Sequence, residues 1–285
     1  MTTLVSAWTA TKQRLADAGI DSPVIDARML VETAAGASRA DILADPQRPL
    51  DSGQSEALEQ LVARREKREP LSHILGAKGF WKIMLKVTPA VLTPRPDTET
   101  ILDVVLPLFA ENEAFSVLDL GVGSGAILLA ILAERPAARG LGVDASDEAL
   151  AVARDNAANL GLASRAAFTH TDWTAGLEGE RFDLVVSNPP YVRSGDIARL
   201  APEVSDHEPR LALDGGRDGL AAFRVLAPQI LRVLKPSGRF AVEFGEGQGP
   251  RVEALFAAAG AQQLALARDL TDRDRVLSGR KKGLG

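Results

Sequence analysis

From residue 116 onward the sequence alternates between strand-like runs and helical segments, and this alternation constrains the fold more than any other feature. The segment FDLVVSNPPY at residues 182–191 contains a continuous apolar run, which is typical of a strand covered on both faces. Strands separated by helices predict an α/β fold with a doubly wound, mostly parallel sheet. Residues 263–280 hold two strand-like runs joined by a polar turn, which predicts an antiparallel C-terminal hairpin.

The start of the chain has a different pattern. Residues 1–70 contain only helical signals, among them a capping serine at Ser38. The β-type run FWKIMLKV at residues 80–87 then predicts a β-hairpin. We therefore expect a small helical domain over 1–70, a hairpin linker over 71–92 and the sheet domain over 93–285.

Composition narrows the possible functions. The chain has 285 residues, 46% of them hydrophobic, with a net charge of −5 and no cysteine. Disulfides, thiolate metal sites and a cysteine nucleophile are excluded, and the scattered histidines predict no metal site. The first residues lack a basic segment followed by an apolar run, so we expect a cytoplasmic protein.

A glycine-rich loop follows the first strand of the sheet domain. It consists of Gly121, Val122, Gly123, Ser124 and Gly125. Glycine lets the backbone approach a ligand closely, and the helix that follows presents unpaired N–H groups. Asp144 ends the next strand, where a carboxylate can accept both hydroxyls of a ribose. Together these features predict a site for a nucleoside-type cofactor.

The alternative to a cofactor site is a tight strand–helix turn followed by a solvated aspartate. A phosphate-binding loop is excluded because no Lys-Ser or Lys-Thr pair follows, and the G-x-G-x-G spacing fits a dinucleotide fingerprint poorly. Asp172 and Trp173 end the third strand, at the edge where ligands bind. Trp173 is expected to stack on the cofactor base or to bound its pocket, unless it is a packing residue.

The fourth strand ends in Asn188, Pro189, Pro190 and Tyr191. Two consecutive prolines lack N–H groups, so the chain must leave the sheet here and expose backbone carbonyls. The side-chain carbonyl of Asn188 and the backbone carbonyl of Pro189 can accept both hydrogens of a planar NH₂ group. Tyr191 offers that group a flat face. The alternative is a plain strand-terminating turn.

This arrangement suits the chemistry of an amide nitrogen, which is a poor nucleophile because its lone pair is delocalised. Two acceptors that hold the hydrogens out of the amide plane favour a pyramidal, nucleophilic nitrogen. Catalysis then comes from orientation and from electrostatic preference for the transition state.

With these motifs the chain resembles class I S-adenosylmethionine-dependent methyltransferases that carry NPPY. More narrowly, it is similar to the release factor glutamine methyltransferases, the PrmC/HemK family. The motifs that carry the resemblance are TPRPDTE at 93–99, DLGVGSGAI at 119–127, VSNPPYV at 186–192, HEPRLALDGGRDGL at 207–220 and RDLTDRDRVLSGR at 268–280.

The resemblance implies a Rossmann-like methyltransferase sheet that binds S-adenosyl-L-methionine, and methylation of the glutamine in the Gly-Gly-Gln loop of class 1 peptide-chain release factors. It implies cofactor contacts from the glycine loop, Asp144, Asp172, Trp173 and Asn188. Catalysis would fall to Asn188, Pro189 and Tyr191, and substrate binding to Asn188, Pro189, Pro190, Tyr191, Thr98 and Glu99. The helical domain would position the protein substrate.

Two positions depart from the family pattern: His73 stands where an aromatic residue is common, and the loop reads GVGSG where GTGTG is common. Neither position takes part in the expected chemistry, and the role of His73 stays open.

Two other functions remain, namely methylation of an exocyclic amine on DNA or RNA and a non-catalytic nucleotide-binding module. Residues 1–90 carry 12 basic and 11 acidic side chains, which gives a nucleic acid little to bind.

Overall fold

The computed structural model describes residues 2–283, which divide into two compact units. The first comprises the chain up to Gly76 together with Ala201–His207, and the second comprises Ala77–Leu200 and the chain from Glu208 onward. The chain therefore leaves the second unit after Leu200, contributes a short segment to the first, and returns.

The first unit is helical. Its helices are α1 (Leu4–Asp17), α2 (Pro23–Ala35), α3 (Arg39–Ala44), α4 (Ser52–Glu66), α5 (Leu71–Leu75) and α9 (Pro202–Ser205). Thr3, Ser38 and Asp51 each close a capping box, which satisfies backbone N–H groups at a helix start. The sequence predicted no helix at α5, where His73 is buried.

A buried ion-pair network attaches the returning segment to the helices of the first unit. Arg65, only 6% exposed, donates from Nε to Asp26 Oδ2 at 2.8 Å and from Nη1 to Glu203 Oε1 at 3.0 Å. Arg68 donates to the other carboxylate oxygen of Glu203 at 2.9 Å. Removing one member would strand a buried charge, so the network fixes α9 against α2 and α4.

The second unit begins with an antiparallel hairpin, β1 (Ala77–Phe80) and β2 (Ile83–Lys86). A short 3-10 turn, η1 (Pro96–Thr98), then leads into α6 (Glu99–Val105) and the 3-10 turn η2 (Leu106–Leu108). The residues expected to contact the substrate, Thr98 and Glu99, therefore lie where this turn becomes a helix.

The main sheet has seven strands in the order β5-β4-β3-β6-β7-β9-β8. They are β3 (Ser116–Leu120), β4 (Arg139–Asp144), β5 (Ala166–His170), β6 (Phe182–Ser187), β7 (Leu234–Glu243), β8 (Gln262–Arg268) and β9 (Asp274–Arg280). Strands β3 to β7 pair in parallel, whereas β9 pairs antiparallel to both β7 and β8. The predicted α/β fold, its mostly parallel sheet and the C-terminal hairpin are confirmed.

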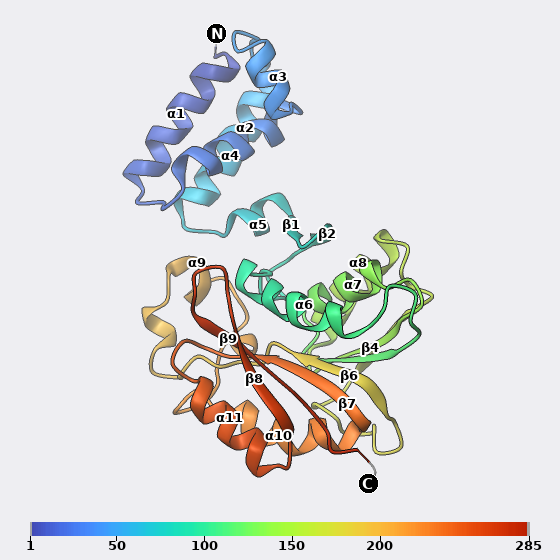
Figure 1. Ribbon diagram of the computed structural model, residues 1–285. Coiled ribbons are helices and arrows are strands. Elements are labelled where there is room, and N and C mark those ends of the chain that lie inside the picture. The colour runs from blue at the N-terminus through green and yellow to red at the C-terminus, as the bar shows by residue number, and fades with distance from the viewer. Residues whose placement is uncertain (1, 284–285) are drawn as a thin grey trace. The chain divides into compact units, whose positions relative to one another are not determined.

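Helices cover both faces of this sheet (Figure 1). Helices α6, α7 (Ala126–Glu134) and α8 (Asp147–Asn159) cover one face, and α10 (Ala221–Val233) and α11 (Gly249–Ala258) cover the other. The linking turns η3 (Ile197–Arg199) and η4 (Arg210–Ala212) follow β6. Each face has its own buried apolar cluster.

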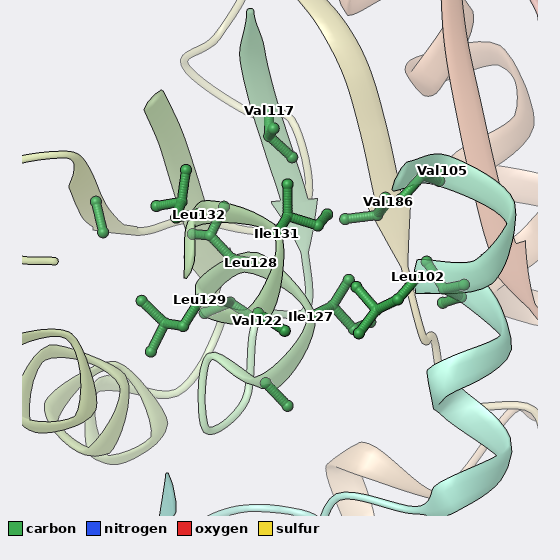
Figure 2. Packing of buried hydrophobic residues seen from close by; sticks show 14 of the residues in the cluster. Leu102, Val105, Val117, Val122, Ile127, Leu128, Leu129, Ile131, Leu132 and Val186 are labelled. Atoms are coloured by element: carbon green, nitrogen blue, oxygen red, sulfur yellow. The ribbon is translucent and has the colours of Figure 1, made fainter. Parts of the chain in front are cut away.

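Figure 2 shows the first cluster, in which Ile127 of α7 points toward Leu102 of α6. Leu128, Leu129 and Ile131 are also fully buried, which explains why α7 is apolar on all sides.

The strand order reverses between β3 and β6, because β4 follows β3 on one side while β6 pairs with its other side. Leu120 and Ser187 are paired at the carboxyl ends of these strands, and the Ser187 hydroxyl donates to the Leu120 carbonyl at 2.7 Å. Ligands of doubly wound sheets bind at such a reversal. The fold therefore places the glycine loop after β3 beside the NPPY segment after β6.

Candidate active site

A cavity of about 380 Å³ lies at this edge of the sheet, within the size range of small-molecule sites. It is lined by loops that follow β3, β4, β5 and β6, and by two segments that lie outside the sheet, Pro89–Arg95 and Pro209–Ala212. All these residues belong to the second unit. Most of the residues predicted to bind the cofactor meet here.

Four residues of the glycine loop, Gly121 to Ser124, line the cavity. The backbone is left-handed at Gly121 (φ 74°) and at Gly123 (φ 53°), a conformation that favours glycine. Gly125 does not line the cavity. It is the left-handed N-cap of α7, and a Cβ there would lie 2.8 Å from Leu129 Cδ1, so its role is to let the helix start.

Asp144 lines the cavity at the end of β4 and also braces the loop. Its Oδ2 accepts from the Gly123 N–H at 2.9 Å, and its Oδ1 accepts from the Ser146 N–H at 3.0 Å. Each carboxylate oxygen has more than one lone pair. The same carboxylate can therefore hold the loop and still accept hydroxyl groups from a ligand.

Two buried side chains support the loop from beneath. Asn156 of α8 donates from Nδ2 to the Ser124 carbonyl at 2.9 Å and to the Lys86 carbonyl at 3.0 Å. Asp119, the β3 residue two before Gly121, accepts from the Leu128 N–H at 3.2 Å. Burial, with the nearby negative charge of Asp144, raises the pKa of Asp119 to about 8. Below that pH the acid beneath the loop is mostly protonated.

The segment after β5 places Asp172 and Trp173 in the cavity wall. Trp173 adopts a left-handed backbone, unusual for a bulky residue (φ 53°). The next residue is fixed by α10, since the Thr174 hydroxyl donates to Gln229 Oε1 at 2.9 Å and accepts from Arg232 at 2.8 Å. This anchoring keeps the Trp173 indole in the wall.

In the NPPY segment, Asn188 and Pro190 line the cavity, whereas Pro189 and Tyr191 do not. The Asn188 side chain donates from Nδ2 to Thr98 Oγ1 at 3.1 Å. This bond occupies the nitrogen end of the amide and leaves Oδ1 as an available acceptor. Asn188 is thus held in the orientation that the amide-binding hypothesis requires.

The segment at residues 93–99 contributes Pro94, Arg95 and Thr98 to the cavity but not Glu99. Glu99 Oε1 instead accepts from the Trp81 N–H at 2.7 Å, so this carboxylate braces the β1–β2 hairpin. Thr98, 4% exposed, stays a candidate contact. We therefore retain Thr98 and not Glu99 in the proposed site.

An ion pair connects two cavity-lining segments that the sequence did not bring together. Arg95 Nη2 donates to both carboxylate oxygens of Glu208, each at 2.7 Å, and the Thr93 N–H donates to Oε1 at 3.3 Å. Burial raises the pKa of Glu208 against the pull of Arg95. The signal was present in the sequence, since Arg95 lies in TPRPDTE and Glu208 lies in HEPRLAL.

No group of histidine and acidic side chains suited to hold a metal ion occurs among residues 2–283. Within that part of the chain, none of the helices is long and apolar enough to cross a membrane.

Comparison with known proteins decides the family. The chain is 63% identical to a release factor glutamine methyltransferase of Caulobacter vibrioides, over 99% of this chain and 98% of that protein. It is 46% identical to the protein of the same name from Rhodospirillum rubrum, over 95% of this chain and 83% of that protein. The chain belongs to the release factor glutamine methyltransferases. The PrmC N-terminal domain family matches residues 6–76, and the methyltransferase small domain family matches residues 97–207.

Solved structures agree on the fold of this methyltransferase. A Pyrococcus furiosus methyltransferase is similar with a TM-score of 0.54 and 17% identity, over 77% of this chain and 98% of that chain. The 16S rRNA N2 G1207 methyltransferase of T. thermophilus has a TM-score of 0.51 and 20% identity, over 72% of this chain and 50% of that chain. At these identities the likeness concerns the Rossmann-like sheet alone.

Proposed function

We propose that this methyltransferase moves a methyl group from S-adenosyl-L-methionine to the side-chain amide nitrogen of the glutamine in the Gly-Gly-Gln loop of class 1 peptide-chain release factors. The observation that carries the proposal is the orientation of Asn188, whose nitrogen is engaged by Thr98 while its carbonyl is left to accept. Family membership supports the same substrate, since the relatives named above are release factor glutamine methyltransferases.

The cavity residues fit this cofactor. Asp144 offers carboxylate oxygens for ribose hydroxyls, and Trp173 offers an indole surface for a base. Gly121, Gly123 and Ser124 line the same cavity, and we expect them to contact the methionine part. When bound, the cofactor supplies an electrophilic methyl group carried by a positively charged sulfur.

The chain's own residues act on the amide that receives the methyl group. The Asn188 side-chain carbonyl and the Pro189 backbone carbonyl each accept one amide hydrogen and hold the NH₂ group out of conjugation. Pro190 and Tyr191 complete the proposed binding surface. With the cofactor bound, the nitrogen would use its lone pair to form the bond to the methyl carbon while the carbon–sulfur bond breaks and leaves its electron pair on sulfur as a neutral thioether. The nitrogen would then lose one hydrogen as a proton. Because the folded protein already holds these groups in place, little structural reorganisation is needed during the reaction.

The two units divide the work in this proposal. Residues 1–70 position the release factor, and residues 71–92 link the domains and contribute Pro89–Leu92 to the cavity wall. Residues 93–285 supply the rest of the cofactor site and the amide site. Because release factors act in translation termination, we expect the enzyme to work in the cytoplasm. Exocyclic-amine methylation of DNA or RNA is the less favoured function, because residues 1–90 are almost neutral.

The experiment is mass spectrometry of a class 1 release factor after incubation with the full-length protein and S-adenosyl-L-methionine. We expect a single added methyl group on the glutamine of Gly-Gly-Gln, and none on a release factor carrying alanine there. Asn188→Ala should slow product formation roughly 100- to 1000-fold, whereas Asn159→Ala, at an exposed α8 residue, should not. Labelled DNA or RNA in parallel reactions tests the alternative, and transfer to nucleic acid alone would overturn the proposal.

A further inference from the structure

Tyr191 is held at its hydroxyl by a carboxylate that the sequence did not single out. The hydroxyl donates to Glu243 Oε1 at 3.0 Å. Glu243 is the last residue of β7 and is 1% exposed. An acid in this position is unusual, because its neighbours Val242 and Phe244 are fully buried apolar residues.

Three glycines pack closely against Tyr191. A Cβ at Gly215 would lie 2.8 Å from the Tyr191 Cα, and one at Gly245 would lie 3.0 Å from its ring carbon Cδ2. A Cβ at Gly219 would lie 2.5 Å from the Tyr191 carbonyl oxygen, which also accepts from Gln248 Nε2 at 3.0 Å. Neither end of Tyr191 is free to move, so its ring has a fixed place.

The charges around Glu243 are unbalanced. Arg275 on β9, 7% exposed, lies 3.4 Å from Asp97 Oδ2 and donates from Nε to Asp269 Oδ2 at 3.2 Å. The Arg275 guanidinium therefore pairs with Asp97 and Asp269, and its positive charge also acts on Glu243. Burial, with the charge of Asp97, raises the pKa of Glu243 to about 7, while Arg275 and the Thr98 and Tyr191 side chains act in the opposite direction.

Thr98 links the same carboxylate to the other half of the NPPY site. Its hydroxyl oxygen accepts from Asn188 Nδ2, and its side chain is among the hydrogen-bonding groups that favour the charged form of Glu243. Glu243 thus interacts with Tyr191 directly and with the Asn188 side chain through Thr98. Within residues 2–283, its second oxygen, Oε2, is buried without a hydrogen-bond partner.

We propose that Glu243 is a positioning residue for methyl transfer: through the Tyr191 hydroxyl and Thr98 it fixes the ring and the amide that receive the substrate glutamine. The proposal rests on the proposed function and assigns the groups that hold its site in place. A negative partner at the hydroxyl also makes the face of the Tyr191 ring more electron-rich. Such a face stabilises positive charge, which the methyl donor carries and the amide nitrogen gains.

The test compares Glu243→Gln, Tyr191→Phe and the double variant with the wild type, using the full chain and a release factor at saturating cofactor. Glu246→Gln is the matched control, since Glu246 lies just after β7, is largely exposed and pairs only with Arg273 in the described chain. At about pH 8, where the Glu243 carboxyl is mostly ionised, we expect Glu243→Gln to lower kcat roughly 10- to 100-fold, because a neutral amide oxygen replaces a charged acceptor, with cofactor affinity unchanged.

The double variant separates positioning from independent damage. If Glu243 acts through the Tyr191 hydroxyl, the double variant should be about as slow as the slower single variant. Losses that multiply, or wild-type kcat in Glu243→Gln, would overturn the proposal. If Glu243→Gln does not fold, as judged by circular dichroism, Tyr191→Phe alone decides, and full kcat in that variant overturns the proposal.

A pH series adds a readout that a merely structural role would not change. The charged or titratable groups facing Glu243 are Tyr191, Asp97 and Arg275, the last also paired with Asp269. As pH falls from about 8 to about 5.5, Glu243 gains a proton, so the wild-type kcat should approach that of Glu243→Gln. A constant ratio would contradict the proposal. A wild-type enzyme that leaves the release factor unmethylated would instead refute the proposed function.

Discussion

Asn188 and Thr98 lie on different elements, after β6 and at the end of η1, and a hydrogen bond of 3.1 Å from Nδ2 to Oγ1 joins them. An asparagine amide can face a site with either end. Because Thr98 engages the nitrogen, the end left to face a substrate is the acceptor. A residue of the 93–99 segment thus determines which end of the Asn188 amide, 90 positions further along the chain, faces the substrate.

Asn188→Ala should therefore lose turnover far more than cofactor affinity. Removal of one preorganised polar contact at a reacting centre costs roughly 2.7–4 kcal/mol in the barrier. Asn188→Asp should also be slow, because its charge stabilises the cationic methyl donor more than the transition state, in which that charge is dispersed. Timed methylation assays at saturating cofactor measure this. Near-normal turnover in Asn188→Ala would mean that the amide is activated by other groups.

Asp144→Ala should weaken the binding of S-adenosyl-L-methionine by about 1.5–3 kcal/mol, the range for hydrogen bonds to a charged acceptor. The variant also removes the acceptor of the Gly123 N–H. Calorimetry measures the affinity, and Asp147→Ala, an exposed acid on α8, is the control. Unchanged affinity would remove Asp144 from the site, and tight competition by NAD would contradict the assigned cofactor.

Asn156→Ala tests the support beneath the glycine loop. It leaves the buried Ser124 carbonyl without its side-chain donor and the Lys86 N–H without an acceptor. A buried group left unsatisfied costs about 1–3 kcal/mol, so we expect lower stability together with weaker cofactor binding. Denaturant unfolding and calorimetry of Asn156→Ala and of the exposed Asn159→Ala give the comparison. Weaker stability with wild-type cofactor affinity would show that the loop does not depend on this residue.

Patterns within short stretches of the sequence were enough to predict the sheet. The apolar run of β6 and the all-apolar α7 indicate burial, and the glycine loop indicates the turn between a strand and a helix. The alternation of strands with helices predicts that the strands pair in parallel. The juxtaposition of the glycine loop with NPPY also follows, because the carboxyl ends of parallel strands meet at one edge. The roles of Asp144 and Asn188 remain predictions that the variants above test.

The features that the sequence did not predict depend on distant partners. Arg65 and Glu203 are 138 positions apart, and nothing near Glu203 indicates that its segment belongs with the first unit. The Glu99 carboxylate accepts a hydrogen bond from the Trp81 N–H in the β1–β2 hairpin, and the 93–99 motif alone does not indicate this partner. Glu243 did carry a signal, an acid within an apolar strand, although only the structure shows Tyr191 as its partner.

The last prediction concerns Asp119 and the dependence of stability on pH. The buried carboxyl has a pKa of about 8 in the folded protein, whereas an unfolded chain gives it an ordinary value near 4. A raised folded-state pKa means that the folded state binds the proton more tightly. The contribution of Asp119 to stability is therefore fully present below pH ~4 and is lost as pH rises toward about 8.

Asp119→Asn removes this titration while keeping an oxygen for the Leu128 N–H, so its stability relative to the wild type should rise with pH. The slope for one such group is on the order of 1 kcal/mol per pH unit between the two pKa values. Urea unfolding at about pH 5.5 and about pH 7.5 should therefore show a relative gain of roughly 2 kcal/mol for the variant. The exposed Asp103→Asn, the same substitution on the protein surface, should show no such change. A pH-independent difference between Asp119→Asn and the wild type would mean that Asp119 is already ionised beneath the glycine loop.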